Sequence, residues 1–125
     1  MSDACPCGSN AEYLACCGRY LDSEQIPDNA EQLMRSRYCA YVLARPDYLL
    51  ATWHASTRPP TISLDVTGQQ WLGLNVIRSH IDLHAGTVEF VARHKVNGKA
   101  YRLHEVSRFV KEQGRWMYLD SDIKH

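Results

Sequence analysis

Four of the five cysteines in this chain lie close together near its N-terminus. They form two pairs: Cys5 and Cys7 in the run Cys-Pro-Cys-Gly, and Cys16 and Cys17 in the run Cys-Cys-Gly. Thiolates are preferred ligands of Zn²⁺, and four of them complete a tetrahedron at about 2.3 Å from the metal. Because four protein ligands leave no open coordination position, the pattern predicts a structural zinc site rather than a catalytic one.

Two other uses of these thiols are disfavoured. The chain opens with residues 1–3, Met-Ser-Asp, and no apolar signal segment follows. We therefore expect a cytoplasmic protein with reduced thiols, not a disulfide framework. A redox pair would have the Cys-x-x-Cys spacing, which these cysteines lack. Gly8 is expected to allow an unusual backbone angle and Gly18 a positive φ, while the fifth cysteine, Cys39, is expected to be a buried core residue.

The run Cys-Pro-Cys-Gly-Ser, followed by Tyr13 and then Cys-Cys-Gly, resembles the SEC-C motif, best known at the C-terminus of the SecA export motor. That motif binds zinc in SecA and contacts the chaperone SecB and the ribosome. The resemblance covers residues 5–18 and implies four zinc ligands: Cys5, Cys7, Cys16 and Cys17. SEC-C motifs usually carry lysines between the cysteine pairs, but residues 10–15 hold no base and one acid, Glu12. We therefore expect a protein partner ahead of the ribosome or nucleic acid.

Composition and charge narrow the range of functions. The chain has 125 residues, enough for one domain with at most a small appendage. Its 14 basic and 14 acidic residues give a formal charge of zero. It therefore lacks the basic excess that favours nucleic acid or an anionic membrane. No apolar run is long enough to span a membrane, so no membrane partner is expected.

After the cysteines, helical patterns come first and strand patterns follow. Asn29 is a predicted N-cap for a helix over residues 30–44, with Gln32 at the capping-box position. A shorter helix is predicted over residues 46–53, because proline is favoured at the first helical position. Residues 61–66 are a weak candidate strand and residues 71–82 a stronger one.

The clearest local signal is Asn97-Gly98 between two β-rich runs, which predicts a two-residue type I′ hairpin. This turn fixes the register and places Glu105 opposite Phe90. Gln113-Gly114 predicts a second hairpin, whose last strand adds either Trp116 and Tyr118 or Met117 and Leu119 to the core. One face of the first hairpin is core-like, and it comprises Val88, Phe90, Ala92, His94, Tyr101, Leu103, Glu105, Ser107 and Phe109.

Two helices followed by a long, bent antiparallel sheet make an α+β fold. The order resembles the cystatin-like cone of the nuclear transport factor 2 (NTF2) superfamily, in which helices cover the concave face of the sheet, often around a pocket. Nearly the whole chain resembles the YchJ family of small bacterial proteins, which join an SEC-C motif to such a domain. The stretches that carry this resemblance are residues 52–59, 71–74, 88–93 and 103–109.

The YchJ resemblance implies a zinc-binding SEC-C motif over residues 1–20 and an NTF2-like domain over residues 21–125. It carries no reaction with it. Many YchJ proteins have a second SEC-C motif at the C-terminus, whereas this chain ends at His125 without one. We therefore expect no activity that requires two zinc modules.

Glu105 is the main candidate for chemistry outside the cysteines. A carboxyl group on an apolar face has a raised pKa unless it finds a donor, which would suit a general acid or base in an apolar pocket. Trp53, His54 and Arg58 are expected at the mouth of the cone, where His54 or Arg58 would orient an anionic substrate. In the alternative, Glu105 pairs with Ser107, Arg58 or a backbone amide and only sets the sheet register.

Two main hypotheses about function follow. The leading one is a non-enzymatic, zinc-binding protein-interaction module, because the ligand set is closed and no Ser-His-Asp order or phosphate-binding glycine loop is present. The second is a small-molecule-binding protein or enzyme that uses the apolar cone, with Glu105 as general acid or base. Nucleic-acid docking ranks third because the formal charge is zero.

Overall fold

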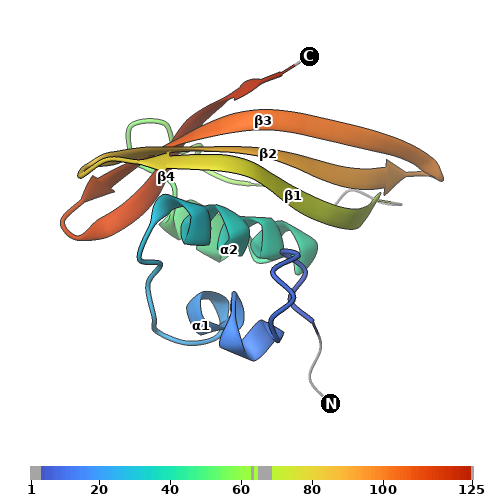
Figure 1. Cartoon of the computed structure of the whole chain (residues 1–125), viewed down its shortest axis with the longest axis horizontal. Coiled ribbons are helices and arrows are strands. Elements are labelled where there is room, and N and C mark those ends of the chain that lie inside the picture. Colours follow the sequence, from blue (N-terminus) through green and yellow to red (C-terminus); the bar gives the residue numbers. More distant parts are fainter. Residues whose placement is uncertain (1–3, 63, 65–68, 125) are drawn as a thin grey trace.

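In the computed structural model, helices cover one side of a four-stranded antiparallel sheet (Figure 1). The structure describes residues 4–62, 64 and 69–124. The strands lie in the order β1-β2-β3-β4, so each pairs with its neighbour in the chain. Their bounds are β1 Gln69–Ile81, β2 Ala85–Val96, β3 Lys99–Glu112 and β4 Arg115–Ile123. The expected α+β fold, with helices on a long antiparallel sheet, is confirmed.

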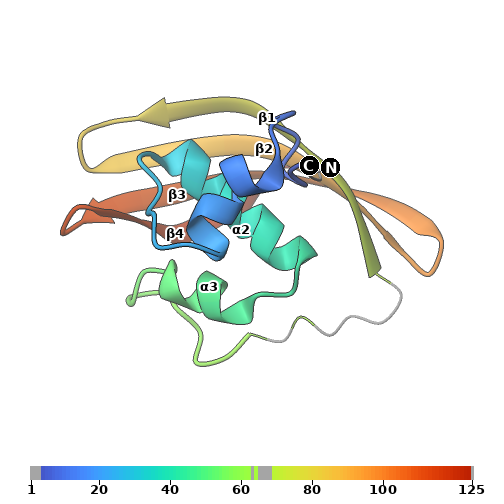
Figure 2. The same cartoon turned by 90° about the horizontal axis from the view of Figure 1, so that it is seen from below.

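The helices form two levels beneath the sheet. Figure 1 shows α2 (Ala30–Val42) between the sheet and the short helix α1 (Gly18–Leu21). Figure 2, seen from below, shows α3 (Pro46–Ala51) beside α2. A 3₁₀ turn, η1 (Tyr13–Ala15), lies between the two cysteine pairs. No helix in the described part of the chain is long and apolar enough to cross a membrane.

Helix α2 begins where its cap predicts. The Asn29 side chain accepts a hydrogen bond from the Gln32 backbone N–H at 2.8 Å, while Asn29 itself is extended. The helix ends at Val42, two residues before the expected end. Beyond this end, Ala44 has a φ of 56°, and the Arg45 N–H donates a hydrogen bond to the Ala40 carbonyl at 2.8 Å. This is the Schellman pattern of helix termination, and it precedes the proline that begins α3.

The β2–β3 hairpin has the predicted register. Val96 pairs with Lys99, and Phe90 pairs with Glu105. Asn97 and Gly98 have φ values of 52° and 83°, and a type I′ turn requires positive φ at both positions. The second hairpin turns at Gln113-Gly114, also with positive φ at both residues.

The inner face of the sheet and helix α2 share one hydrophobic core with the cysteines. Val88 and Phe109 of the sheet are buried against Leu33 of α2. Trp116 and Tyr118 join this core, which settles the choice left open for β4. The same cluster includes Cys5, Cys7 and Cys17. The N-terminal motif and the α+β domain are therefore packed as one body.

Strand β1 is longer than expected and irregular. It begins at Gln69 and has bulges between Trp71 and Gly73 and between Val76 and Arg78. Bulges of this kind bend a strand and increase its twist. Of the weak candidate strand over residues 61–66, residues 61, 62 and 64 are not in a strand. Its other residues lie outside the described part of the chain.

Candidate functional site

The four N-terminal cysteines converge on one point. Their Sγ atoms all lie within 4.8 Å of one another. The Sγ atoms of Cys7 and Cys16 are 3.7 Å apart, and those of Cys16 and Cys17 are 4.0 Å apart. Four sulfurs at about 2.3 Å from one tetrahedral ion would be separated by about 3.8 Å. The cluster therefore has the dimensions of a four-thiolate metal site, so a metal ion fits these residues.

Short backbone contacts bring the two cysteine pairs together. The Cys5 N–H donates to the Ala11 carbonyl at 2.9 Å. Gly8 has a φ of 81°, as its position predicts, and a Cβ added there would lie 3.0 Å from the Leu74 carbonyl of β1. The expectation for Gly18 is wrong, because this residue opens α1 and does not have positive φ. A Cβ at Gly18 would instead meet the Tyr13 carbonyl at 2.8 Å.

Helix α2 supplies two contacts to the thiol cluster. Cys39 is fully buried, as expected, and its Sγ also lies 3.5 Å from the Sγ of Cys5. Arg35 donates through Nη1 to the Cys7 carbonyl at 2.9 Å, while its Nε binds Glu31. Hydrogen bonds from Cys17 and Cys39 hold the pKa of the Cys7 thiol well below its usual value. The cluster is not uniform in this respect, because burial raises the pKa of the Cys16 thiol and the hydrogen bond with Cys39 raises that of the Cys17 thiol.

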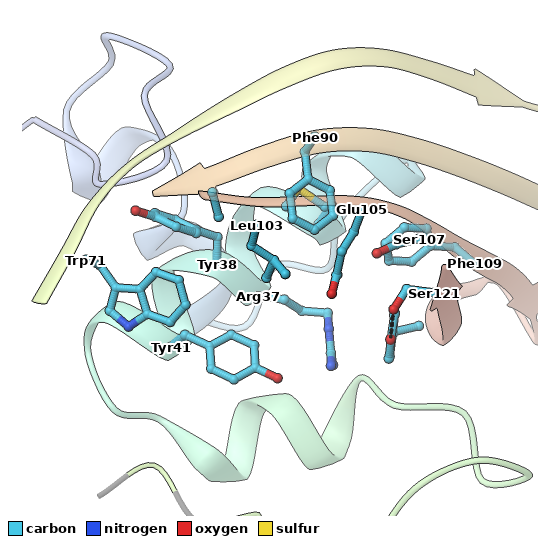
Figure 3. Close-up of a pocket in the computed structure, with 13 residues that line it drawn as sticks. Arg37, Tyr38, Tyr41, Trp71, Phe90, Leu103, Glu105, Ser107, Phe109 and Ser121 are labelled. Carbon is cyan, nitrogen blue, oxygen red and sulfur yellow. Dashed lines mark hydrogen bonds between the residues drawn. The ribbon is translucent and has the colours of Figure 1, made fainter. Parts of the chain in front are cut away.

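A separate cavity of about 280 Å³ lies between α2 and the inner face of the sheet (Figure 3). Its walls are mainly aromatic and aliphatic, with a few polar groups among them. Glu105 is one of these groups. The lining residues are Met34, Arg37, Tyr38, Tyr41, Trp71, Phe90, Ala92, Leu103, Glu105, Ser107, Phe109, Tyr118 and Ser121.

Glu105 is half-buried in this cavity and unpaired. Among the described residues, its carboxyl group makes no hydrogen bond or ion pair, whether with Ser107, Arg58 or a backbone amide. Burial raises its pKa above the ordinary value of a glutamate. The alternative, in which Glu105 pairs with a hydrogen-bond donor and only sets the sheet register, is therefore not observed among the described residues.

The structure does not bring His54 or Arg58 to Glu105. The His54 ring contacts Ser56 Oγ at 2.8 Å through Nδ1 and Glu112 at 2.9 Å through Nε2. Arg58 is exposed, and neither residue lines the cavity. Both lie on the segment after α3, whose backbone is tied to β4 through the His54 N–H and the Tyr118 carbonyl. That attachment holds the segment outside the cavity.

The cation that does share the cavity with Glu105 is Arg37, which sequence reasoning missed. It lies on α2 and is only 6% exposed. Its Nη1 donates to the Leu49 carbonyl at 2.8 Å and to Thr52 Oγ1 at 2.7 Å. Burial lowers its pKa to about 10, so it is still charged at neutral pH. The spacing of Arg37 could have identified it as buried, because it lies four residues after Leu33 and therefore on the same buried face of the helix.

Two family models match this chain. Residues 29–121 match the family model of the YchJ middle NTF2-like domain, and residues 1–19 match the SEC-C motif. The UPF0225 protein of Methylibium petroleiphilum is 55% identical over 95% of this chain and 88% of its own length. The UPF0225 protein of a Polaromonas species is 58% identical over 96% of this chain and 93% of its own length.

Two solved structures share the fold. The solution structure of a SEC-C motif containing protein from Rhodopseudomonas palustris has a TM-score of 0.87 and 35% identity, with both chains fully covered. The crystal structure of a SEC-C motif containing protein from Psychrobacter arcticus has a TM-score of 0.77 and 26% identity. That match covers 98% of this chain and 84% of the other.

The raised pKa of Glu105 predicts a pH-dependent stability. The native state keeps this proton to higher pH than the unfolded chain, so stability falls as pH rises through the native pKa. We expect Glu105→Gln to unfold at a higher urea concentration than the wild type at pH 7, because a partly buried charge is removed. The free energy of unfolding should rise by less than about 1 kcal/mol, since the half-exposed carboxylate of the wild type keeps part of its hydration. The gain should disappear towards pH 4. The exposed control Glu24→Gln should show no such gain, and an equal gain in both variants would contradict the assignment.

Proposed function

This chain belongs to the YchJ family of SEC-C motif proteins, and we propose that it is a zinc protein whose N-terminal knuckle contacts another protein. The knuckle is residues 4–21, which include both cysteine pairs, η1 and α1. The convergence of four Sγ atoms within 4.8 Å is the observation that carries the zinc assignment. The role of the ion is structural, because four thiolates fill a tetrahedral zinc site.

The position of the cluster explains what zinc would do here. Cys7 and Cys17 are at most 1% exposed and pack in the core that also contains Leu33. Zinc would hold these sulfurs together as thiolates, which otherwise repel one another. It would thereby fix the knuckle against α2 and β1, where Arg35 and Gly8 make close contacts.

The outer surface of the knuckle supports a protein partner. Leu14, in the turn between the two cysteine pairs, is 69% exposed. Ser9, Asn10 and Glu12 beside it are exposed and bring no positive charge. An apolar side chain with a neutral or acidic rim suits a protein surface better than a nucleic acid. On the outer face of the sheet, Arg108 is paired with Asp120 and Asp122, which also disfavours a phosphate partner.

A second candidate function is small-molecule binding in the cavity above α2. It is favoured by the unpaired Glu105 inside a cavity of about 280 Å³, close to the lower end of typical ligand pockets at about 300 Å³. Glu105 would act there as a binding group or as a general acid or base. The fold alone does not decide between a binder and an enzyme, because one fold can host unrelated functions.

The zinc assignment predicts one zinc per chain in the protein purified without added metal, measured by elemental analysis. Cys7→Ser should lose most of this zinc and lower the melting temperature by roughly 10 °C, because the site links the knuckle to the core. Cys39→Ser is the matched control, since Cys39 is a buried cysteine that touches Cys5 but is not one of the four proposed ligands, and it should keep one zinc. Loss of zinc from Cys39→Ser with retention in Cys7→Ser would refute the ligand set.

The knuckle contact predicts that Leu14→Glu weakens partner capture at least tenfold without releasing zinc. The charge would have to be buried in the contact, which is unfavourable. Pull-downs from the native host compared by quantitative mass spectrometry provide the measurement. Leu83→Glu is the control, because Leu83 is 79% exposed in the turn between β1 and β2, far from the knuckle in sequence. Equal capture by both variants and the wild type would rule out this surface.

The cavity function predicts that some compounds from a library of small polar metabolites shift the amide resonances of pocket residues. Ala92→Leu fills part of the cavity from β2, where Ala92 is 2% exposed, and should abolish those shifts. Leu83→Ala, away from the cavity lining, should leave them unchanged. Shifts that persist in Ala92→Leu, or a library that produces none, would remove the support for a ligand-binding cone.

A further inference from the structure

Arg37 presents unused hydrogen-bond donors to the cavity. A guanidinium group has five N–H donors, and here only Nη1 donates to described residues, Leu49 and Thr52. Among the buried side-chain nitrogen and oxygen atoms of the described residues, His94 Nδ1 is the one without a partner. Nε and Nη2 of Arg37 are not among these fully buried atoms, so they keep some exposure, and the cavity is a space that Arg37 lines.

The Arg37 guanidinium is held rigidly in this orientation. Its Cζ lies 4.4 Å from the ring centroid of Tyr118 and 5.1 Å from that of Trp53. These cation–π contacts stabilise the charge without supplying a counter-ion. No carboxylate of the described residues lies within 4.0 Å of it. A preorganised cation with free donors is a site for an anionic group such as a carboxylate.

Glu105 provides the opposite charge on the other wall. Figure 3 shows Glu105 reaching from the sheet and Arg37 reaching from α2 into the same space. The two groups do not form an ion pair, since their charged atoms are more than 4.0 Å apart. Two separated charges of opposite sign, each partly desolvated, are costly unless something neutralises both.

We propose that the cavity binds a small zwitterion of the amino-acid type, with its carboxylate on Arg37 and its ammonium group on Glu105. This inference rests on the second proposed function, ligand binding in the cone, and names the class of ligand. A monoanion would be repelled by Glu105 and a monocation by Arg37, whereas a zwitterion is attracted by both. The charge pattern of the walls thus selects a ligand of zero net charge that carries both signs.

The remaining walls define the rest of the ligand. The part of the cavity towards Trp71 is lined by Tyr38, Tyr41 and Leu103, whose side chains are labelled in Figure 3. Tyr38 and Tyr41 contact Trp71, with ring centroids 5.6 Å and 6.0 Å apart. An aromatic or branched apolar side chain of the ligand would fill this end.

Three probes with one common ring separate the alternatives: L-phenylalanine carries both charges, phenylacetate only the negative one, and 2-phenylethylamine only the positive one. Binding to the full-length zinc-loaded protein is followed through NMR shifts of the Trp71 indole and Arg37 Nε–H signals. We expect the dissociation constant of phenylalanine to be at least tenfold lower than that of either single-charge probe.

Two variants test the role of each wall. Glu105→Gln should weaken phenylalanine and phenylethylamine about tenfold and leave phenylacetate unchanged or tighter. Arg37→Lys, which loses the planar fork, should weaken phenylalanine and phenylacetate and spare phenylethylamine. If Arg37→Lys does not fold, the response of Glu105→Gln to the three probes still decides, because this isosteric change leaves the packing in place.

Two outcomes overturn the proposal. If phenylacetate or phenylethylamine binds in the cavity as tightly as phenylalanine, the zwitterion class is wrong while ligand binding by the cone stands. If none of the probes shifts the Trp71 or Arg37 signals at millimolar concentration, the amino-acid class is wrong. The metabolite screen with Ala92→Leu then tests ligand binding by the cone separately.

Discussion

The packing of helix α2 between the cysteine cluster and the sheet is the constraint on which the rest of the structure depends. Cys39 touches the thiols on one side of this helix, and Arg37, two residues earlier, enters the cavity on the other. Two residues along an α-helix reverse the direction of the side chain, so one short segment serves both sites. The cap at Asn29 and the Schellman end at Ala44 fix the length of this segment.

This arrangement changes the role expected of the SEC-C motif. The sequence predicts that the motif is an appendage to an NTF2-like domain, but in the structure Cys5, Cys7 and Cys17 belong to the core of that domain. The proposed zinc ion would therefore stabilise the packing on one side of α2, while the sheet packs on the other side of this helix. Because Arg37 is on the same helix, the metal site would also stabilise the wall of the cavity.

Local signals predicted much of the fold correctly. Asn97-Gly98 fixed the register of β2 and β3 because both turn residues tolerate positive φ, and this pairing placed Glu105 on the inner face. Asn29 marked the start of α2 because its side chain can accept an N–H from the first turn. Errors arose at Gly18, which tight packing against Tyr13 requires, and at the end of α2, where an alanine takes the left-handed conformation that glycine usually occupies.

The sequence by itself determined the four clustered cysteines, the hairpin register and the position of Glu105 on the inner face of the sheet, because each depends on residues close in the chain or on strict alternation. The tertiary structure alone decided which groups face one another. It placed Arg37 with Glu105 and kept His54 and Arg58 apart from both. It also brought Cys39 to Cys5, 34 residues away. These contacts between residues distant in the sequence depend on how α2 is rotated against the sheet. That rotation is set by the packing of the whole core and not by any local sequence pattern.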